Sequence, residues 1–271
     1  MQLLAGTSGF SYKEWYGHFY PEKLPANEML RYYAGHFSTV EINNTFYRMP
    51  APSMLEQWIE QVPDGFSFTL KAPRRITHIE RLKESAQSVA EFLRRASFLG
   101  TKLGVILFQL PPFLKKDLPR LSSFLELLPA NRRFAFEFRS DTWQDEEIYA
   151  ALCARNVMLC VTDTEKGDTP MVTTSDWAYI RLRRTHYDEA DLRAWSAIIA
   201  KQPVGRTHVY FMHEDEALGT GFARTLRAAG RLRSTVAKGT VDASQEDLRR
   251  ARSAKLARHA PIISPPDTAF R

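Results

Sequence analysis

The sequence predicts a single-domain α/β protein of the TIM-type (β/α)8 barrel class. Eight apolar runs of strand length recur along the chain, and the spacers between them mostly show helical periodicity. The 271 residues are close to the roughly 250 of one such barrel. No GxGxxG or phosphate-loop motif supports the alternative, an open doubly wound sheet. The runs cover residues 3–8, 39–43, 66–71, 104–110, 134–139, 157–163, 177–183 and 207–213.

Several spacers carry the apolar stripe of an amphipathic helix. The clearest is 85–100, in which an N-cap at Ser85 and a stop at Gly100 enclose the stripe. A second, 145–156, begins with acids that suit the positive end of a helix dipole. Shorter helices are expected over 122–128 and 192–199.

A basic extension is expected to follow the barrel. From residue 234 the chain turns polar, then basic in DLRRARSAKLARHA, and finally rich in Pro. This change in composition predicts a barrel over 1–233 and a C-terminal extension over 234–271. The extension supplies part of the formal net charge of +6, so the barrel itself is closer to neutral.

Composition favours a soluble protein of a reducing compartment. The two cysteines, Cys153 and Cys160, are too few for a disulfide framework and lack CxxC spacing. The N-terminus has no basic leader, and no segment approaches the 18 apolar residues of a membrane span. We therefore expect a cytoplasmic protein without a membrane partner.

Polar side chains gather at the carboxyl ends of the predicted strands. Alternation assigns the uniformly apolar positions of each strand to the helices, so the polar positions face the barrel interior. Barrel enzymes assemble their active sites at this end. The charged residues expected to meet there are Glu41, Lys71, Glu137, Arg139, Asp163, Arg181 and Arg183.

Two interpretations of these charges stay open. Three carboxylates against four cations leave one cation over, which indicates an anion site, and phosphates often bind near strand seven of such barrels. Alternatively the charges pair off as a buried network, Lys71 with Glu41 and Arg139 with Glu137 or Asp163. An oxygen-rich barrel end can also assemble a Mg²⁺ or Mn²⁺ site without a linear motif.

Residues near the strand ends add further candidates. His213 follows the eighth strand, and His78 lies in a loop after Lys71. The segment GTSGFSYKEWYGHFYP offers Ser8 and Tyr12 as donors and a dense group of aromatic residues. That group either packs beneath the first loop or forms a stacking platform for a base or sugar ring.

The motifs, taken in order, resemble those of the domain-of-unknown-function 72 family, also called YecE-like. The resemblance rests on GTSGFSYKEWYGHFYP, VEINNTFYRMP, FSFTLKAPRRITH, LGVILFQLPPFL, FAFEFRSDTW and YIRLR, and it runs from about residue 3 to 230. It implies a TIM-type barrel and carries no settled activity. Residues similar to the family's at the barrel end are Tyr12, Glu41, Asn43, Thr45, Lys71, His78, Gln109, Glu137, Arg139, Trp143 and Arg181.

Two segments depart from the family pattern. After the seventh strand the family reads something like RLHG, whereas this chain has RLRRTHY, with Arg183 at the place of a histidine. After the eighth strand an FNND-type motif is replaced by FMHEDEALG, so Met212 and His213 stand where amides are expected. Chemistry that uses those amides or that histidine is therefore not implied here.

The leading hypothesis is an enzyme acting on a phosphate-containing or sugar-phosphate ligand, in the manner of a phosphodiesterase or nuclease-like hydrolase. Glu41 or Glu137 is the expected general base or metal ligand, Arg139 and Arg181 clamp the anion with Lys71, and the amides orient the substrate. The alternative is a non-catalytic nucleic-acid-binding protein that uses the basic extension and the aromatic first loop. An inert scaffold is a third hypothesis.

Overall fold

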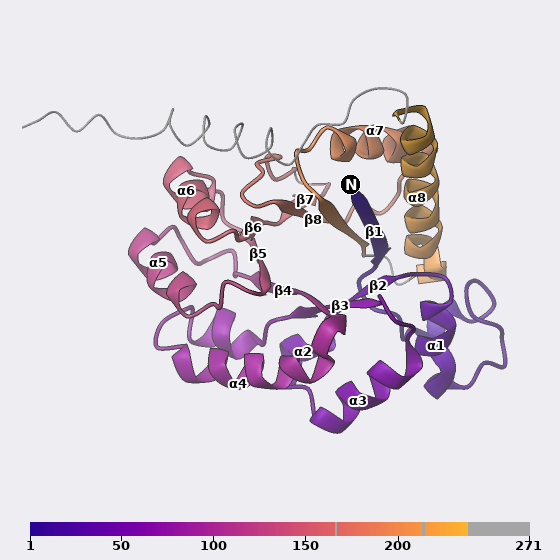
Figure 1. Cartoon of the computed structure of the whole chain (residues 1–271), viewed down its shortest axis with the longest axis horizontal. Helices are drawn as coiled ribbons and strands as arrows, with labels where there is room; N and C mark the ends of the chain where they lie inside the picture. Colours follow the sequence, from indigo (N-terminus) through magenta and orange to yellow (C-terminus); the bar gives the residue numbers. More distant parts are fainter. Residues whose placement is uncertain (166, 213–214, 238–271) are drawn as a thin grey trace, which may run out of the picture. The chain divides into compact units, whose positions relative to one another are not determined.

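The strands of this protein form parallel sheets (Figure 1). The structure is a computed structural model, and it describes residues 1–165, 167–212 and 215–237. One sheet has the order β1, β9, β8, β7 and the other the order β2, β3, β4, β5, β6. The predicted α/β class with parallel strands is confirmed. The strands span Gln2–Thr7 (β1), Thr39–Ile42 (β2), Ser67–Lys71 (β3), Leu103–Gln109 (β4), Arg133–Glu137 (β5), Met158–Leu159 (β6), Val161–Asp163 (β7), Trp177–Leu182 (β8) and Arg206–Phe211 (β9).

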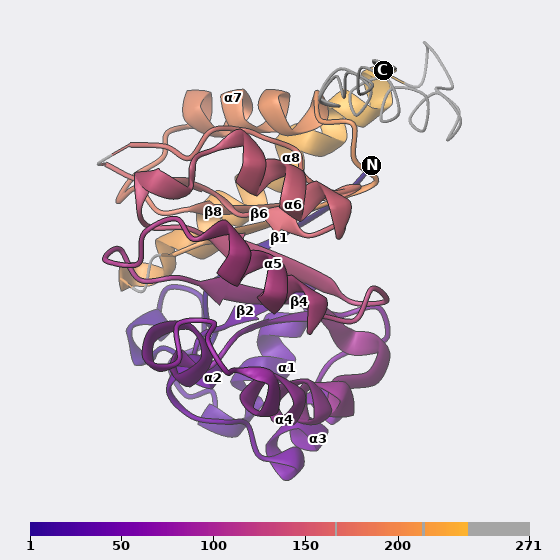
Figure 2. The ribbon, with the colours of Figure 1, turned by 90° about the vertical axis from the view of Figure 1, so that its left-hand side faces the viewer.

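Helices connect the strands and cover them from outside, as Figures 1 and 2 show for α3 to α7. Short 3-10 turns and one π-helical turn, Arg75–Ile79, occur in the loops. The helices span Met29–Ala34 (α1), Asn44–Tyr47 (α2), Pro52–Gln61 (α3), Ala86–Ala96 (α4), Leu118–Glu126 (α5), Glu146–Ala154 (α6), Glu189–Ala200 (α7) and Leu218–Ala237 (α8).

The predicted helices are present, with different ends. α4 occupies most of 85–100, but the Ser85 hydroxyl donates to the Lys83 carbonyl and does not cap the helix. The chain then continues as a 3-10 turn through Gly100, whose φ of 53° is left-handed. α5 begins earlier than expected because Asp117 caps it by accepting from the Arg120 backbone N–H.

The sixth predicted strand divides between the two sheets at Cys160. Its first part, β6, pairs with β5, and its second part, β7, pairs with β8. The backbone N–H of Cys160 still donates to the Phe136 carbonyl at 2.8 Å. One run of the sequence therefore belongs to both sheets.

A second connection joins the sheets at the carboxyl ends of β1 and β2. Ser8 and Glu41 form a parallel bridge, and the Gly9 N–H donates to the Glu41 carbonyl at 2.8 Å. The close approach requires glycine at position 6, because a Cβ there would lie 2.3 Å from the Thr39 carbonyl oxygen.

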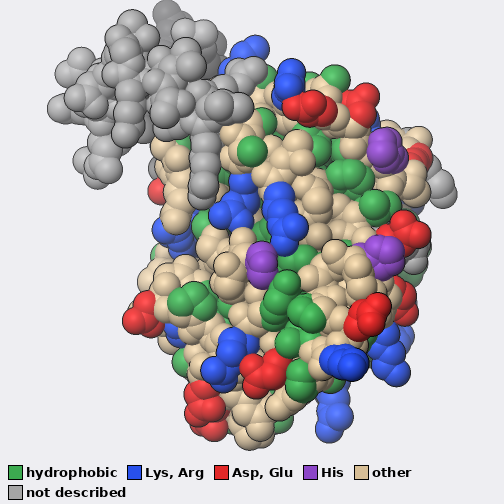
Figure 3. All heavy atoms as spheres, turned by 90° about the vertical axis from the view of Figure 1, so that its right-hand side faces the viewer, with side chains coloured by type: hydrophobic (Ala, Val, Ile, Leu, Met, Phe, Trp, Pro, Cys, Tyr) green, Lys and Arg blue, Asp and Glu red, His purple; other side chains and the backbone are tan. Residues whose placement is uncertain are grey.

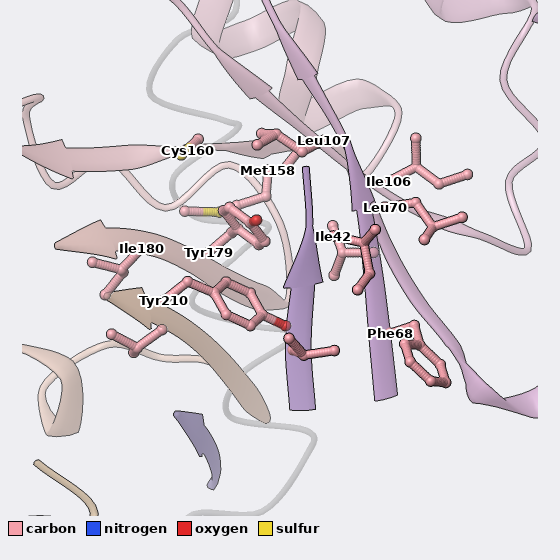
Figure 4. Packing of buried hydrophobic residues seen from close by; sticks show 14 of the residues in the cluster. Ile42, Phe68, Leu70, Ile106, Leu107, Met158, Cys160, Tyr179, Ile180 and Tyr210 are labelled. Carbon is pink, nitrogen blue, oxygen red and sulfur yellow. The ribbon is translucent and has the colours of Figure 1, made fainter. Parts of the chain in front are cut away.

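Side chains alternate between the helices and the space between the two sheets, as the sequence predicts. Figure 4 shows side chains of both sheets inside that space, and other apolar side chains on the opposite sides of their strands. The Tyr210 hydroxyl bonds to Thr39 at 2.6 Å and to Thr69 at 2.8 Å, which ties β9 to β2 and β3 across the interior. The inward residues of Figure 4 include Leu107, Met158, Tyr179 and Tyr210, and the outward ones Phe68, Leu70 and Ile106.

The contacts divide the chain into two units, Met1–Arg231 and Leu232–Arg271. Most of the predicted basic extension lies outside the described residues, so its boundary at residue 234 stays a prediction. Among the described residues, no helix is both long and apolar enough to span a membrane.

Candidate functional site

A buried arginine connects two buried carboxylates at the carboxyl ends of the strands. The Arg181 guanidinium donates to Glu41 at 2.8 Å and to Glu137 at 2.5 Å. The three side chains are at most 3% exposed, so the charges compensate each other away from solvent. Burial opposes the charged form of Arg181, but the two carboxylates raise its pKa well above the ordinary value.

Glu41 has no free acceptor position facing the solvent. Its Oε1 also accepts from the Ser8 hydroxyl at 2.5 Å, and its Oε2 accepts from the Tyr179 hydroxyl. The predicted pairing of Glu41 with Lys71 does not occur in this structure, where Arg181 takes that place.

Several hydrogen-bond donors contact Glu137 and stabilise its ionised form. Its Oε1 accepts from Gln109 at 2.7 Å, from Arg139 at 3.2 Å and from Arg183 at 3.3 Å. Burial raises the pKa of this carboxyl, but Arg181, Arg139 and Arg183 together outweigh burial and lower the pKa to about 2. Glu137 is therefore a poor proton acceptor near neutral pH.

Lys71 differs from the other cations of this group because, among the described residues, its ammonium has neither an ion pair nor a hydrogen bond. The ammonium lies over the Phe46 ring, 4.1 Å from the centroid. Burial and the charge of Arg181 lower the pKa of Lys71 to about 8, against the opposing effect of the two glutamates. Near neutral pH a fraction of this amine is therefore unprotonated.

His78 lies in the Arg75–Ile79 turn, and its ring contacts the same Phe46 ring as the Lys71 ammonium. Its ring contacts Phe46 edge to face at 5.0 Å, and its Nδ1 is 2.9 Å from the Thr77 hydroxyl. Burial and the charges of Lys71 and Arg139 lower the pKa of His78, which favours a neutral imidazole at pH 7.

Three further predicted residues, Tyr12, Asn43 and Thr45, lie on segments that follow β1 and β2. The Tyr12 hydroxyl donates to the Ser8 carbonyl at 2.6 Å, and its ring occupies the space where a Cβ on Gly9 would lie. Asn43 has a buried Oδ1 without a partner among the described residues. Thr45 is fully buried and donates to the Lys71 carbonyl at 2.6 Å, so it fixes the end of β3 and offers nothing to a ligand.

The structure does not bring Asp163 and Trp143 into the cluster. The Asp163 carboxylate accepts from Tyr187 and from Trp195 of α7, and pairs with Arg184 at 3.2 Å, so it faces the helix layer. Trp143 is fully buried, stacks on Phe138 at 4.8 Å and donates to the Leu114 carbonyl. The prediction that these two side chains reach the shared site is wrong. His213 lies outside the described residues.

Two partners of Glu41 were not assigned to the site by the sequence. Ser8 is predicted only as a donor of the first loop, and the position of Tyr179 follows only from the alternation of its strand, so neither is linked to a carboxylate by the sequence. The alternation of β8, which places Tyr179 on the same face as Arg181, was the available signal.

The charged side chains that meet at the carboxyl ends of the strands carry a net positive charge. We call Glu41, Lys71, Gln109, Glu137, Arg139, Arg181 and Arg183 the carboxyl-end cluster. With Asp163 turned outward, this cluster has two carboxylates against four cations. Among the described residues, no group of three or more His, Cys, Asp or Glu is placed to hold a metal. The glutamate oxygens already accept from guanidinium groups, which is a poor donor set for a divalent cation.

The described residues define an α/β protein with parallel sheets and a buried, arginine-centred site at the ends of its strands. The chain belongs to the family described as "Protein of unknown function DUF72", whose model matches residues 4–246. The resemblance predicted from the sequence motifs is thereby confirmed.

Curated relatives match part of the chain. UPF0759 protein YecE of Escherichia coli strain K12 is 40% identical over 111 residues, which is 41% of each protein. UPF0759 protein YunF of Bacillus subtilis strain 168 is 27% identical over 138 residues, 48% of this chain and 49% of YunF. The matched regions therefore span less than half of the length of these relatives.

Solved structures match most of the chain. A DUF72 family protein of Thermotoga maritima MSB8 superposes with a TM-score of 0.72 at 28% identity, covering 87% of this chain and 99% of that one. A DUF72 family protein of Enterococcus faecalis V583 gives a TM-score of 0.71 at 16% identity, covering 85% and 96%. The second likeness concerns the fold alone.

Proposed function

We propose that this protein is a (β/α)8-barrel enzyme that binds a phosphate-containing anion at the carboxyl ends of its strands and hydrolyses a phosphoester bond in it. Closure of the barrel is supported at both junctions between the sheets. The sixth predicted strand pairs with β5 on one side and β8 on the other, and the Ser8–Glu41 bridge joins β1 to β2. These contacts support a ring of eight strands, in which β6 and β7 are the two parts of one strand.

Anion binding is supported by one observation above all: the carboxyl-end cluster has four cations for two carboxylates, and the Lys71 ammonium has no anionic partner among the described residues. Arg139 and Arg183 each share one oxygen of Glu137 at more than 3 Å, and both are partly exposed. A phosphate accepting from Lys71 and these guanidiniums would neutralise the excess charge.

The acid–base roles differ from those that the sequence predicts. Glu137, with a pKa of about 2, and Glu41, whose two oxygens are occupied, are framework groups that hold Arg181. Lys71, with a pKa of about 8, is the group suited to proton transfer. Its neutral amine accepts a proton from an attacking water, the new phosphorus–oxygen bond forms, and the ester bond breaks. The leaving oxygen takes up a proton from solvent, and Lys71 later returns its extra proton to solvent.

The test compares Lys71→Met with Lys71→Arg, using bis(p-nitrophenyl) phosphate as a generic phosphodiester and inorganic phosphate as a binding probe. Lys71→Met should lose both hydrolysis and phosphate binding at this site, whereas Lys71→Arg should keep binding and lose hydrolysis, because a guanidinium does not deprotonate. Lys201→Met, at an exposed position in the turn after α7, is the matched control. Unchanged hydrolysis in Lys71→Met would exclude the proposed role.

The alternative, a nucleic-acid-binding protein, is weakened at the first loop. Trp15, Phe19 and Tyr20 are at most 6% exposed and pack on one another, so they offer no stacking faces. On the face shown in Figure 3, Lys and Arg side chains are interspersed with Asp and Glu. The basic extension remains the feature that favours this alternative.

A further inference from the structure

A polar cavity of about 160 Å³ lies at the end of the strands opposite to the carboxyl-end cluster. Five of its lining residues are the first residues of their strands, and these strands come from both sheets. A buried water needs roughly 10–15 Å³ of such volume, so the cavity can hold a multi-atom ligand. The five residues are Gln2 of β1, Ser67 of β3, Leu103 of β4, Arg133 of β5 and Arg206 of β9.

Two arginines, Arg133 and Arg206, line this cavity. Among the described residues, neither Arg133 nor Arg206 forms an ion pair, and Arg206 bonds only through its Nε to Gln2, at 2.8 Å. Burial and the charge of Arg206 lower the pKa of Arg133, with Asp176 opposing. Two partly desolvated cations that repel each other are unfavourable unless an anion compensates them.

Neutral donors at the same end are also unsatisfied. The Ser67 hydroxyl lines the cavity, its residue is 9% exposed, and among the described residues it has no hydrogen-bond partner. Trp177, the first residue of β8, lies outside the lining of the cavity but also has a buried indole N–H without a partner among the described residues. Buried donors without acceptors are rare in folded proteins, and each costs stability.

Gly104 lines the same cavity and makes room for one of these donors. A Cβ at this position would lie 2.1 Å from the Ser67 hydroxyl oxygen. The hydroxyl therefore keeps its place only because residue 104 has no side chain.

We propose that this cavity is a second anion site, which binds a small tetrahedral oxyanion, phosphate or sulfate, between Arg133 and Arg206. The oxyanion would accept from both guanidiniums and from the Ser67 hydroxyl, and it would remove the repulsion between the two cations. The bound group is either a free ion or the terminal phosphate of a small molecule whose remainder projects toward solvent.

The test measures inorganic phosphate binding by calorimetry at constant ionic strength in the Lys71→Gln protein, which lacks the free cation of the carboxyl-end cluster. This protein should still bind phosphate, and adding Arg133→Gln or Arg206→Gln should weaken the affinity about tenfold or more, because each removes a charged donor. Arg193→Gln, at an exposed arginine of α7, is the matched control and should leave the affinity unchanged.

Further measurements distinguish a free ion from a phosphomonoester, and a further variant tests the site without replacing an arginine. Equal affinity for glycerol 1-phosphate would identify a phosphomonoester site, and binding of inorganic phosphate alone would identify a free ion. Ser67→Ala removes the neutral donor that lines the cavity and has no hydrogen-bond partner among the described residues, so its affinity loss supports the site even if the arginine variants do not fold. The proposal is overturned if millimolar phosphate fails to bind, or if folded Arg133→Gln and Arg206→Gln bind it as tightly as their parent.

Discussion

Replacing Glu41 by Gln should destabilise this protein strongly, because it removes one of the two charges that compensate buried Arg181. Breaking a buried ion pair costs about 3–5 kcal/mol. Arg181 retains Glu137 at 2.5 Å, and the Gln side chain can still accept from the Ser8 or Tyr179 hydroxyl. We therefore expect a loss near the lower end, about 3 kcal/mol in the free energy of unfolding.

The measurement is urea unfolding at pH 7, followed by circular dichroism, together with the thermal midpoint. For a unit of this size, a loss of about 3 kcal/mol lowers the Tm by roughly 6–12 °C. Glu91→Gln is the matched control, because Glu91 pairs with Arg94 and Arg95 on the surface of α4 and its removal should leave the Tm nearly unchanged.

A double-mutant cycle separates the ion pair from other effects. Arg181→Met leaves two buried carboxylates without their cation, so the single change should be costly, and adding Glu41→Gln should recover part of the loss. A loss below about 1 kcal/mol for Glu41→Gln, or additive effects in the cycle, would refute the view that this pair is a compensated buried charge.

Three further expectations concern titration and the extension. Lys71 has a folded pKa of about 8, below its unfolded value of 10.5, so the unfolded state binds more protons between these values. Stability should rise from pH 8 to 10.5 in the wild type and lack this rise in Lys71→Met, as measured by urea unfolding. Glu137 has a folded pKa of about 2 against 4.5, so its stabilisation, about 3 kcal/mol at most, is present above pH 4.5 and lost toward pH 2. Glu137→Gln should flatten that acid limb. Deleting 234–271 should leave phosphodiester hydrolysis unchanged; loss of a salt-dependent affinity for DNA instead would favour the nucleic-acid alternative.

Strand periodicity predicted which side chains turn inward on most strands. Tyr179 and Arg181 point to the same face of β8, and both reach Glu41 across the interior. This success has a physical cause, because a strand buried on both sides is uniformly apolar only on the helix-facing side. The inward-facing side of each strand could therefore be predicted from Glu41, Lys71 and Glu137 without any knowledge of their partners.

The directions of side chains at or just after the ends of strands were predicted less well. Trp143 lies in a turn, and its direction is set by stacking on Phe138 and by the Leu114 carbonyl, neither of which is encoded by a local period. Asp163 ends β7, and Tyr187, Trp195 and Arg184 draw its carboxylate toward the helix layer. Such directions depend on contacts between segments far apart in the sequence.

The outward turn of Asp163 changes the electrostatics of the candidate site. If this carboxylate joined the carboxyl-end cluster, one cation would be left over; with Asp163 held by Arg184 and Tyr187, two are. Glu137 already accepts from three guanidiniums, and Glu41 already faces Arg181, so neither has capacity left for Lys71. The depressed pKa of Lys71 and the excess positive charge are thus two results of the same arrangement. An anion bound by the partly exposed arginines beside Lys71 would relieve the excess positive charge.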